Sequence, residues 1–123
     1  MSIQFDEKIP IYLQIIDFIK KDIVTERLKG GEKLPSVREF AEQLKVNPNT
    51  VQRVYQEMER EGITSTIRGT GTFVKDDQKM IERIKWDMAK ELMNSFVEGM
   101  KGIGLTPEQI KSYIIEFIDR EEK

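Results

Sequence analysis

The sequence predicts a mostly α-helical fold with a small β-hairpin, in which a winged helix-turn-helix precedes two C-terminal helices. Three observations lead to this prediction. Two short amphipathic helices flank an Asn-Pro turn, a glycine-tipped hairpin follows directly, and an apolar-rich helical pair ends the chain. We expect a winged helix-turn-helix domain over residues 1–75 and a helical dimerisation segment over residues 76–123.

The first of the two short helices is predicted to begin at Ser36. The sequence Ser36-Val-Arg-Glu39 has the form of a capping box, in which the serine hydroxyl accepts from the Glu39 backbone N–H and the glutamate reaches back. Apolar residues then recur at the spacing that places them on one face of a helix. They are Val37, Phe40, Ala41 and Leu44.

The second helix has its own start and stop signals. Asn47 can cap the helix, and Pro48 suits the first helical position because its missing N–H has no intrahelical partner there. Gly62 follows the helix and can take the left-handed conformation that ends it. The apolar face is predicted to consist of Val51, Val54, Tyr55 and Met58.

Polar residues are unevenly distributed along this second helix. Its C-terminal half carries Glu57, Glu59 and Glu61. Its N-terminal half carries amides and an arginine with no acid among them. A helix that enters the major groove with its N-terminus leading needs this distribution, since amides and Arg pair with base edges while carboxylates repel phosphates. An ordinary solvated helix is the alternative for this helix alone. The N-terminal half carries Asn49, Thr50, Gln52, Arg53 and Gln56.

The hairpin favours the DNA-binding alternative. Residues 63–67 form a β-branched run, residues 68–71 form a turn with two glycines, and residues 72–74 return. Gly69 and Gly71 permit positive φ and close approach of the backbone. Arg68 lies at the tip, from which it could reach a phosphate or the minor groove. Directly after a helix-turn-helix, such a hairpin is typical of a DNA-binding wing.

The run LPSVREFAEQLKVNPNTVQRVYQEMEREGI…RGTGTFV resembles the winged helix of the GntR family of bacterial transcription regulators, over residues 8–75. The resemblance implies that Arg38 contacts a DNA phosphate and that Arg68 and Gly69 approach the minor groove. Many members have Ser-Arg-x-Thr-Val-Arg at the positions of residues 47–52. The Asn-Pro-Asn-Thr sequence that this chain has there is similar to the small YtrA-like subgroup. The resemblance assigns major-groove contacts to Pro48, Asn49, Thr50, Gln52 and Arg53.

The segment before the helix-turn-helix is predicted to support it. Residues 1–8 are expected to form a loose arm, and a helix should follow from residue 9 to about residue 27. Lys33 and Leu34 are candidates for a short strand beside the wing. The apolar stripe of the helix, which we interpret as core, consists of Tyr12, Ile15, Ile16, Ile19 and Ile23.

After the wing, a long helix is predicted from about Asp77 to Lys101, a break at residues 102–104, and a last helix behind a second capping box at Thr106–Gln109. Two helices cannot bury all their apolar residues against each other, so we expect an identical chain to cover them. Packing back on the chain's own head is the alternative. The expected dimer contacts are Ile84, Trp86, Met88, Leu92, Phe96, Ile114, Ile115, Phe117 and Ile118.

Composition limits the possible functions. The chain has no cysteine and no histidine, which excludes disulfides and thiolate or imidazole metal sites, and no cofactor is expected. No run of 18 apolar residues or signal peptide is visible, so we expect a cytoplasmic protein with no membrane contact. No catalytic constellation is apparent, so an enzyme is not expected. The net charge of −2 predicts weak non-specific DNA affinity.

Together these features favour a sequence-specific DNA-binding transcription regulator, a repressor, acting as a homodimer on an inverted-repeat operator of double-stranded DNA. The resemblance to the YtrA-like subgroup adds the chain's own operon and ABC-transporter genes as targets. The alternative is a winged-helix protein-interaction module without operator binding. The residues identify neither the operator sequence nor a small-molecule effector.

Overall fold

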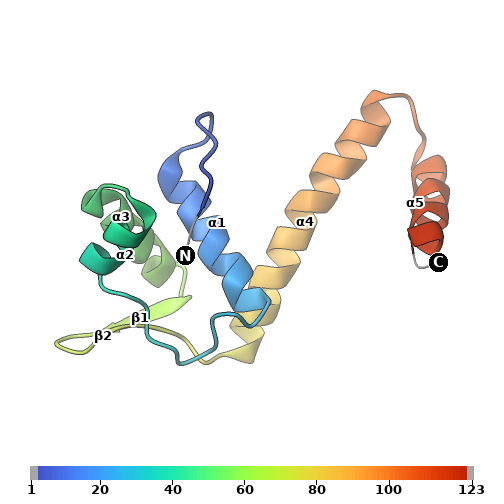
Figure 1. Cartoon of the computed structure of the whole chain (residues 1–123). Helices are drawn as coiled ribbons and strands as arrows, with labels where there is room; N and C mark the ends of the chain where they lie inside the picture. The colour runs from blue at the N-terminus through green and yellow to red at the C-terminus, as the bar shows by residue number, and fades with distance from the viewer. Residues whose placement is uncertain (1–2, 122–123) are drawn as a thin grey trace. The chain divides into compact units, whose positions relative to one another are not determined.

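The computed structural model describes residues 3–121 and confirms the predicted fold class. Its elements, drawn in Figure 1, fall into two compact units, a head that extends to Ile84 and a C-terminal unit that begins at Lys85. Because α4 continues from one unit into the other, its first turns belong to the head. The elements are α1 (Ile11–Val24), α2 (Val37–Leu44), α3 (Pro48–Arg60), β1 (Thr64–Ile67), β2 (Gly71–Val74), α4 (Gln78–Gly102) and α5 (Pro107–Glu121).

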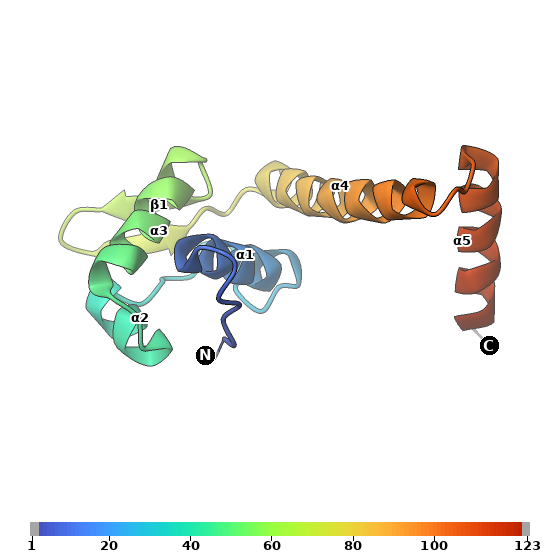
Figure 2. The ribbon, with the colours of Figure 1, turned by 90° about the horizontal axis from the view of Figure 1, so that it is seen from above.

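Helix α3 is the centre of the head. It packs against α1, α2 and β1, and Figure 2 shows these elements grouped around it. Val51, Val54 and Met58 are fully buried on its inner side. Ile15, Ile16, Ile19 and Ile23 of α1 are buried as predicted, but Tyr12 at the N-terminal end of the same stripe is only half-buried.

The described part of the N-terminal arm is tied to α1 through the Gln14 side chain. The Asp6 backbone N–H donates to Gln14 Oε1 at 2.8 Å. The Gln14 side-chain amide donates in return to the carbonyl oxygens of Asp6 and Ile9, each at 2.8 Å. The expectation of a loose arm is therefore wrong at Asp6, while its residues 1 and 2 lie outside the described residues.

The predicted start signals of α2 and α3 are confirmed. The Glu39 backbone N–H donates to Ser36 Oγ at 3.1 Å, and the Ser36 N–H donates to Glu39 Oε1 at 3.2 Å. Hydrogen bonding of the Glu39 carboxylate by the Ser36 side chain and by the Ser36 backbone N–H lowers the pKa of Glu39. Asn47 caps α3 by accepting from the Asn49 N–H at 2.8 Å, with Pro48 at the first helical position.

The end of α3 is fixed by Gly62, as predicted. Gly62 has φ of +78°, a left-handed conformation that costs a residue without Cβ little. Its N–H donates to the Glu59 carbonyl at 3.0 Å, and the Ile63 N–H donates to the Met58 carbonyl at 2.9 Å. This pair of bonds is a Schellman motif, and the buried Met58 and Ile63 accompany it with apolar side chains.

The wing is an antiparallel pair in which Thr64 faces Val74 and Ile67 faces Gly71. The predicted short strand beside it is present as a bridge between Lys33 and Phe73. The Leu34 N–H also donates to the Thr72 carbonyl at 2.8 Å. The segment before α2 therefore anchors the base of the wing to the helix-turn-helix.

Residue Tyr55 links α3 to the start of α2. Its hydroxyl donates to the Pro35 carbonyl at 2.6 Å, and its ring stacks on Phe40 with centroids 6.2 Å apart. Burial, together with the nearby charge of Glu39, raises the pKa of Tyr55 well above its ordinary value. The neutral hydroxyl is thus a structural donor that sets the distance between the two helices.

The C-terminal unit buries very little within the chain. The capping box at Thr106 is confirmed, since its N–H donates to Gln109 Oε1 at 2.9 Å and the Gln109 N–H donates to Thr106 Oγ1 at 3.2 Å. Among residues 85–121 only Ile110 is buried. The remaining apolar stripe of α5 carries three of the expected dimer contacts, and within a single chain it is exposed or half-buried. It consists of Tyr113, Ile114, Phe117 and Ile118.

We expect Tyr55→Phe to lower the free energy of unfolding by about 1 kcal/mol, because it removes one hydrogen bond and leaves a carbonyl without its donor. Denaturant unfolding measures this loss. Tyr12→Phe is the matched control and should change stability little, since the described residues show no hydrogen bond to the Tyr12 hydroxyl. Tyr55 ionises more readily in the unfolded chain, so the difference between wild type and Tyr55→Phe should shrink as the pH rises above 10.0. Equal stability of the two proteins at neutral pH would contradict this role.

Candidate nucleic-acid interface

One side of α3 presents a continuous polar strip. Asn49, Gln52, Arg53 and Gln56 are exposed, and at 3.6 residues per turn their spacing places them on the same face. This face lies opposite the buried side that contacts the other helices. The structure therefore brings the predicted base-reading side chains together on one accessible surface without a carboxylate among them.

Two predicted residues flank this strip at the helix N-terminus. Pro48 occupies the first turn and is exposed, and it donates no N–H. Thr50 is half-buried at the edge of the strip. Pro48 therefore shapes the turn and the helix start, whereas Thr50 can offer a hydroxyl from the side.

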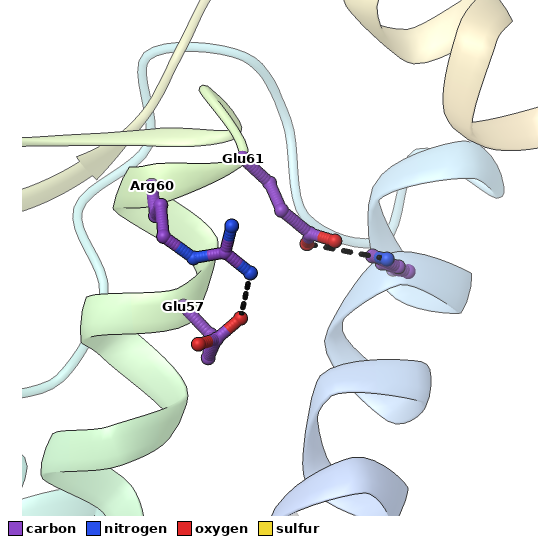
Figure 3. Close-up of polar contacts among 4 residues, drawn as sticks. Glu57, Arg60 and Glu61 are labelled. Atoms are coloured by element: carbon purple, nitrogen blue, oxygen red, sulfur yellow. Dashed lines mark hydrogen bonds and ion pairs between the residues drawn. The ribbon is translucent and has the colours of Figure 1, made fainter.

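The acids at the other end of α3 each have a partner. Glu57 pairs with Arg60 at 2.6 Å and Glu61 pairs with Lys20 of α1 at 3.4 Å, as Figure 3 shows. Glu59 accepts from the backbone N–H of Thr66 in β1 at 3.2 Å. The hydrogen bond from Arg60 lowers the pKa of Glu57. The carboxylates of α3 thus hold the helix to its neighbours or to a cation.

Arg53 is in contact with α1. Its Cζ lies 3.6 Å from the centroid of the Tyr12 ring. Tyr12 and Arg53 line an open cleft of about 340 Å³ together with Ile11, Asn49 and Thr50. Sequence reasoning assigned Tyr12 to the core and missed this contact. An aromatic residue with a polar tip at the first turn of an otherwise aliphatic stripe was the available signal.

The wing carries its predicted arginine at an exposed turn. Arg68 is exposed, Gly69 has φ of +80°, and the Thr70 N–H donates to the Ile67 carbonyl at 2.9 Å. Positive φ at the third residue of a turn favours glycine, so Gly69 shapes the tip. In Figures 1 and 2 this turn projects beyond α2 and α3, away from α1.

Two further cations lie near these elements. Arg38 is exposed in the first turn of α2, where the resemblance placed a phosphate contact. The Lys33 side chain lies against Gly71, and a Cβ at Gly71 would stand 2.6 Å from Lys33 Cε. Gly71 therefore leaves room for the Lys33 side chain beside the wing, where the sequence predicted a short strand at Lys33 and Leu34.

The described residues offer no competing metal centre. Residues 3–121 contain no group of three or more Asp, Glu, His or Cys side chains placed to hold a metal ion. Among the helices that the structure describes, none has the length and apolar character needed to cross a membrane.

Comparison with known proteins identifies the head. Residues 11–74, which span α1 to the end of β2, match the family described as bacterial regulatory proteins, gntR family. The uncharacterized HTH-type transcriptional regulator YhcF of Bacillus subtilis is 47% identical over 119 residues, covering 97% of this chain and 98% of YhcF. The HTH-type transcriptional repressor YtrA of the same organism is 40% identical over 109 residues, covering 87% of this chain and 83% of YtrA.

A solved structure extends the similarity to nearly the whole chain. A GntR family transcriptional regulator from Listeria monocytogenes superposes with a TM-score of 0.84 at 42% identity, covering 91% of this chain and 98% of that chain. The similarity therefore includes the C-terminal helices as well as the head. The predicted resemblance is confirmed, and the chain belongs to the GntR family of bacterial helix-turn-helix transcription regulators.

Proposed function

We propose that this chain is a homodimeric repressor that binds an inverted-repeat operator on double-stranded DNA in the cytoplasm. The observation that carries the proposal is the exposed strip of α3, where amides and an arginine share one face without an acid. Such a face suits the major groove, because amide and guanidinium groups can pair with base edges.

The cations that flank the strip would contact the phosphates of the DNA backbone. Arg38 in the first turn of α2, Arg68 at the wing tip and Lys33 beside the wing are all exposed. Cations at such positions fix the register of a protein on DNA but carry no sequence information. Asn49, with its N–H already engaged by the Asn47 cap, retains its side-chain amide for a base.

A second copy of the chain would cover the C-terminal unit. Trp86, Leu92 and Phe117 are 60%, 74% and 65% exposed, which is unusual for residues of this size. A groove of about 640 Å³ between α4 and α5 is lined mainly by apolar side chains, among them Phe96 and Ile118. Ile114 also lines this groove, and the proposed dimer surface includes the half-buried Met88 and the exposed Ile115. Ile84 is buried within the head, so the proposed dimer surface does not include it.

The relatives suggest the direction of control. YtrA, which shares most of its length with this chain, is described as a repressor. We therefore propose repression, with the operators of the chain's own operon and of ABC-transporter genes as the first to test. Footprinting on the DNA upstream of its own gene is the direct experiment.

We expect Arg38→Ala and Arg68→Ala each to weaken binding to operator and unrelated DNA alike, and to reduce the slope of log affinity against log salt by roughly one. Operator binding measured at several salt concentrations gives the slope. Arg27→Ala, an exposed arginine beyond the C-terminal end of α1, is the control and should leave it unchanged. Unchanged slopes for Arg38→Ala and Arg68→Ala would exclude phosphate contacts by these residues.

We expect Gln52→Ala to weaken binding to the preferred site by about 1–3 kcal/mol and to relax the preference at one base pair in each half-site. Competition with a series of single-base operator variants measures this preference. Gln43→Ala, which truncates an exposed glutamine of α2, is the matched control. If Gln52→Ala ranks the operator variants as wild type does, Gln52 does not read a base.

We expect the full chain to sediment as a dimer at micromolar concentration and Phe117→Glu to sediment as a monomer. Phe117→Glu would remove two Phe117 side chains from the dimer interface, and burying each of them contributes about 1.5–3 kcal/mol. Ser112→Glu, an exposed polar position on α5, is the control for added charge. A monomeric wild type would remove the basis for the dimer.

A further inference from the structure

We infer that Tyr12 is a positioning residue for base recognition, which holds the flat face of the Arg53 guanidinium so that its N–H edge is presented to the major groove. The inference rests on the proposed function, in which Arg53 reads a base. It adds a residue of α1 to a recognition surface otherwise built from α2, α3 and the wing.

The contact distance defines how the two groups meet. Arg53 Cζ lies over the Tyr12 ring, 3.6 Å from its centroid. An edge-on approach at this distance would drive guanidinium nitrogens into the ring, so the two planes must lie roughly face to face. The five N–H donors of a guanidinium lie in its plane and are not consumed by stacking on its face. Arg53 can therefore be held by Tyr12 and still donate to a guanine.

A carboxylate that could form an ion pair with Arg53 lies close by. Glu57 is one turn further along α3, at the i+4 spacing where opposite charges usually pair. Instead, Glu57 bonds Arg60 at 2.6 Å, and the described residues show no ion pair for Arg53. A pair with Glu57 would occupy donors that base recognition needs. Arg60 thus holds Glu57 in an ion pair, and Arg53 is supported by the uncharged ring of Tyr12.

The position of the contact fits this role. Tyr12 is half-buried in the first turn of α1, next to the packed residues that join α1 to α3. Its ring and Arg53 line the same cleft as Asn49 and Thr50, at the leading end of α3. An arginine side chain loses rotamer entropy when it binds a base. Stacking on Tyr12 in the free protein already restricts the side chain, so less entropy is lost when DNA binds.

The test compares Tyr12→Leu, which removes the aromatic face, with Tyr12→Phe, which keeps it. We expect Tyr12→Leu to weaken binding to the preferred operator by about 2–5-fold, the size of an exposed cation–π contact. It should also relax the preference only at the base pair that Arg53→Ala affects, while Tyr12→Phe should match wild type. Phe18→Leu, another half-buried aromatic of α1, is the matched control.

Two further measurements separate positioning from a general loss of structure. In a double-mutant cycle, Tyr12→Leu should cost nothing further once Arg53 is alanine. In the free protein, the side-chain protons of Arg53 should show an upfield ring-current shift in wild type and Tyr12→Phe that Tyr12→Leu abolishes. Tyr12→Trp offers a larger face, so it should retain the shift and the base preference even if Tyr12→Leu folds poorly.

The outcomes distinguish this inference from the proposed function. If Arg53→Ala leaves the ranking of operator variants unchanged, Arg53 does not read a base and that part of the proposed function fails. If Arg53→Ala changes the ranking but Tyr12→Leu does not, only the positioning role is wrong. A loss in Tyr12→Phe equal to that in Tyr12→Leu would assign the effect to the hydroxyl and overturn the stacking argument.

Discussion

The burial of one side of α3 is the constraint on which the head depends. Val51, Val54 and Met58 leave no surface in contact with water, because α1, α2 and β1 all pack around the same helix. Removing so much apolar surface from water strongly favours one rotation of the helix about its axis. That rotation leaves Asn49 and Gln52 exposed on the opposite side. The hydrogen bond from Tyr55 to the Pro35 carbonyl then fixes α3 against the start of α2.

Charge within the head is arranged so that an acidic chain can approach a polyanion. Net charge is −2, which by itself opposes binding to nucleic acid. The carboxylates of α3 are confined to its C-terminal half, where Arg60, Lys20 and the Thr66 backbone engage them. Such exposed pairs add little to stability. These acids lie away from the leading end of the helix, and among the described residues none of them forms an ion pair with Arg53.

Local chemistry explains which features the sequence predicted well. The capping box of Ser36, the cap of Asn47 and the Schellman glycine Gly62 each depend on residues within a few positions of one another, so their outcome could be read from the chain. The Tyr12–Arg53 contact depends instead on the angle at which α1 crosses α3, and helical periodicity carries no information about that angle. The sequence also predicted an apolar-rich last helix, yet helical periodicity cannot say whether the same chain or another covers Phe117.

The two units differ in how far each can fold by its own contacts. The head has a shared core of three helices and the wing, whereas among residues 85–121 only Ile110 is buried. Ordering these helices costs conformational entropy that one buried side chain cannot offset, so their stability should come from association. If a second copy supplies it, assembly and operator binding become linked, because each head alone offers few cations to phosphate. Joining two weak heads raises the effective concentration of the second one at its half-site. Discrimination between operator and other DNA would then rest on base contacts made twice, rather than on a strong non-specific attraction.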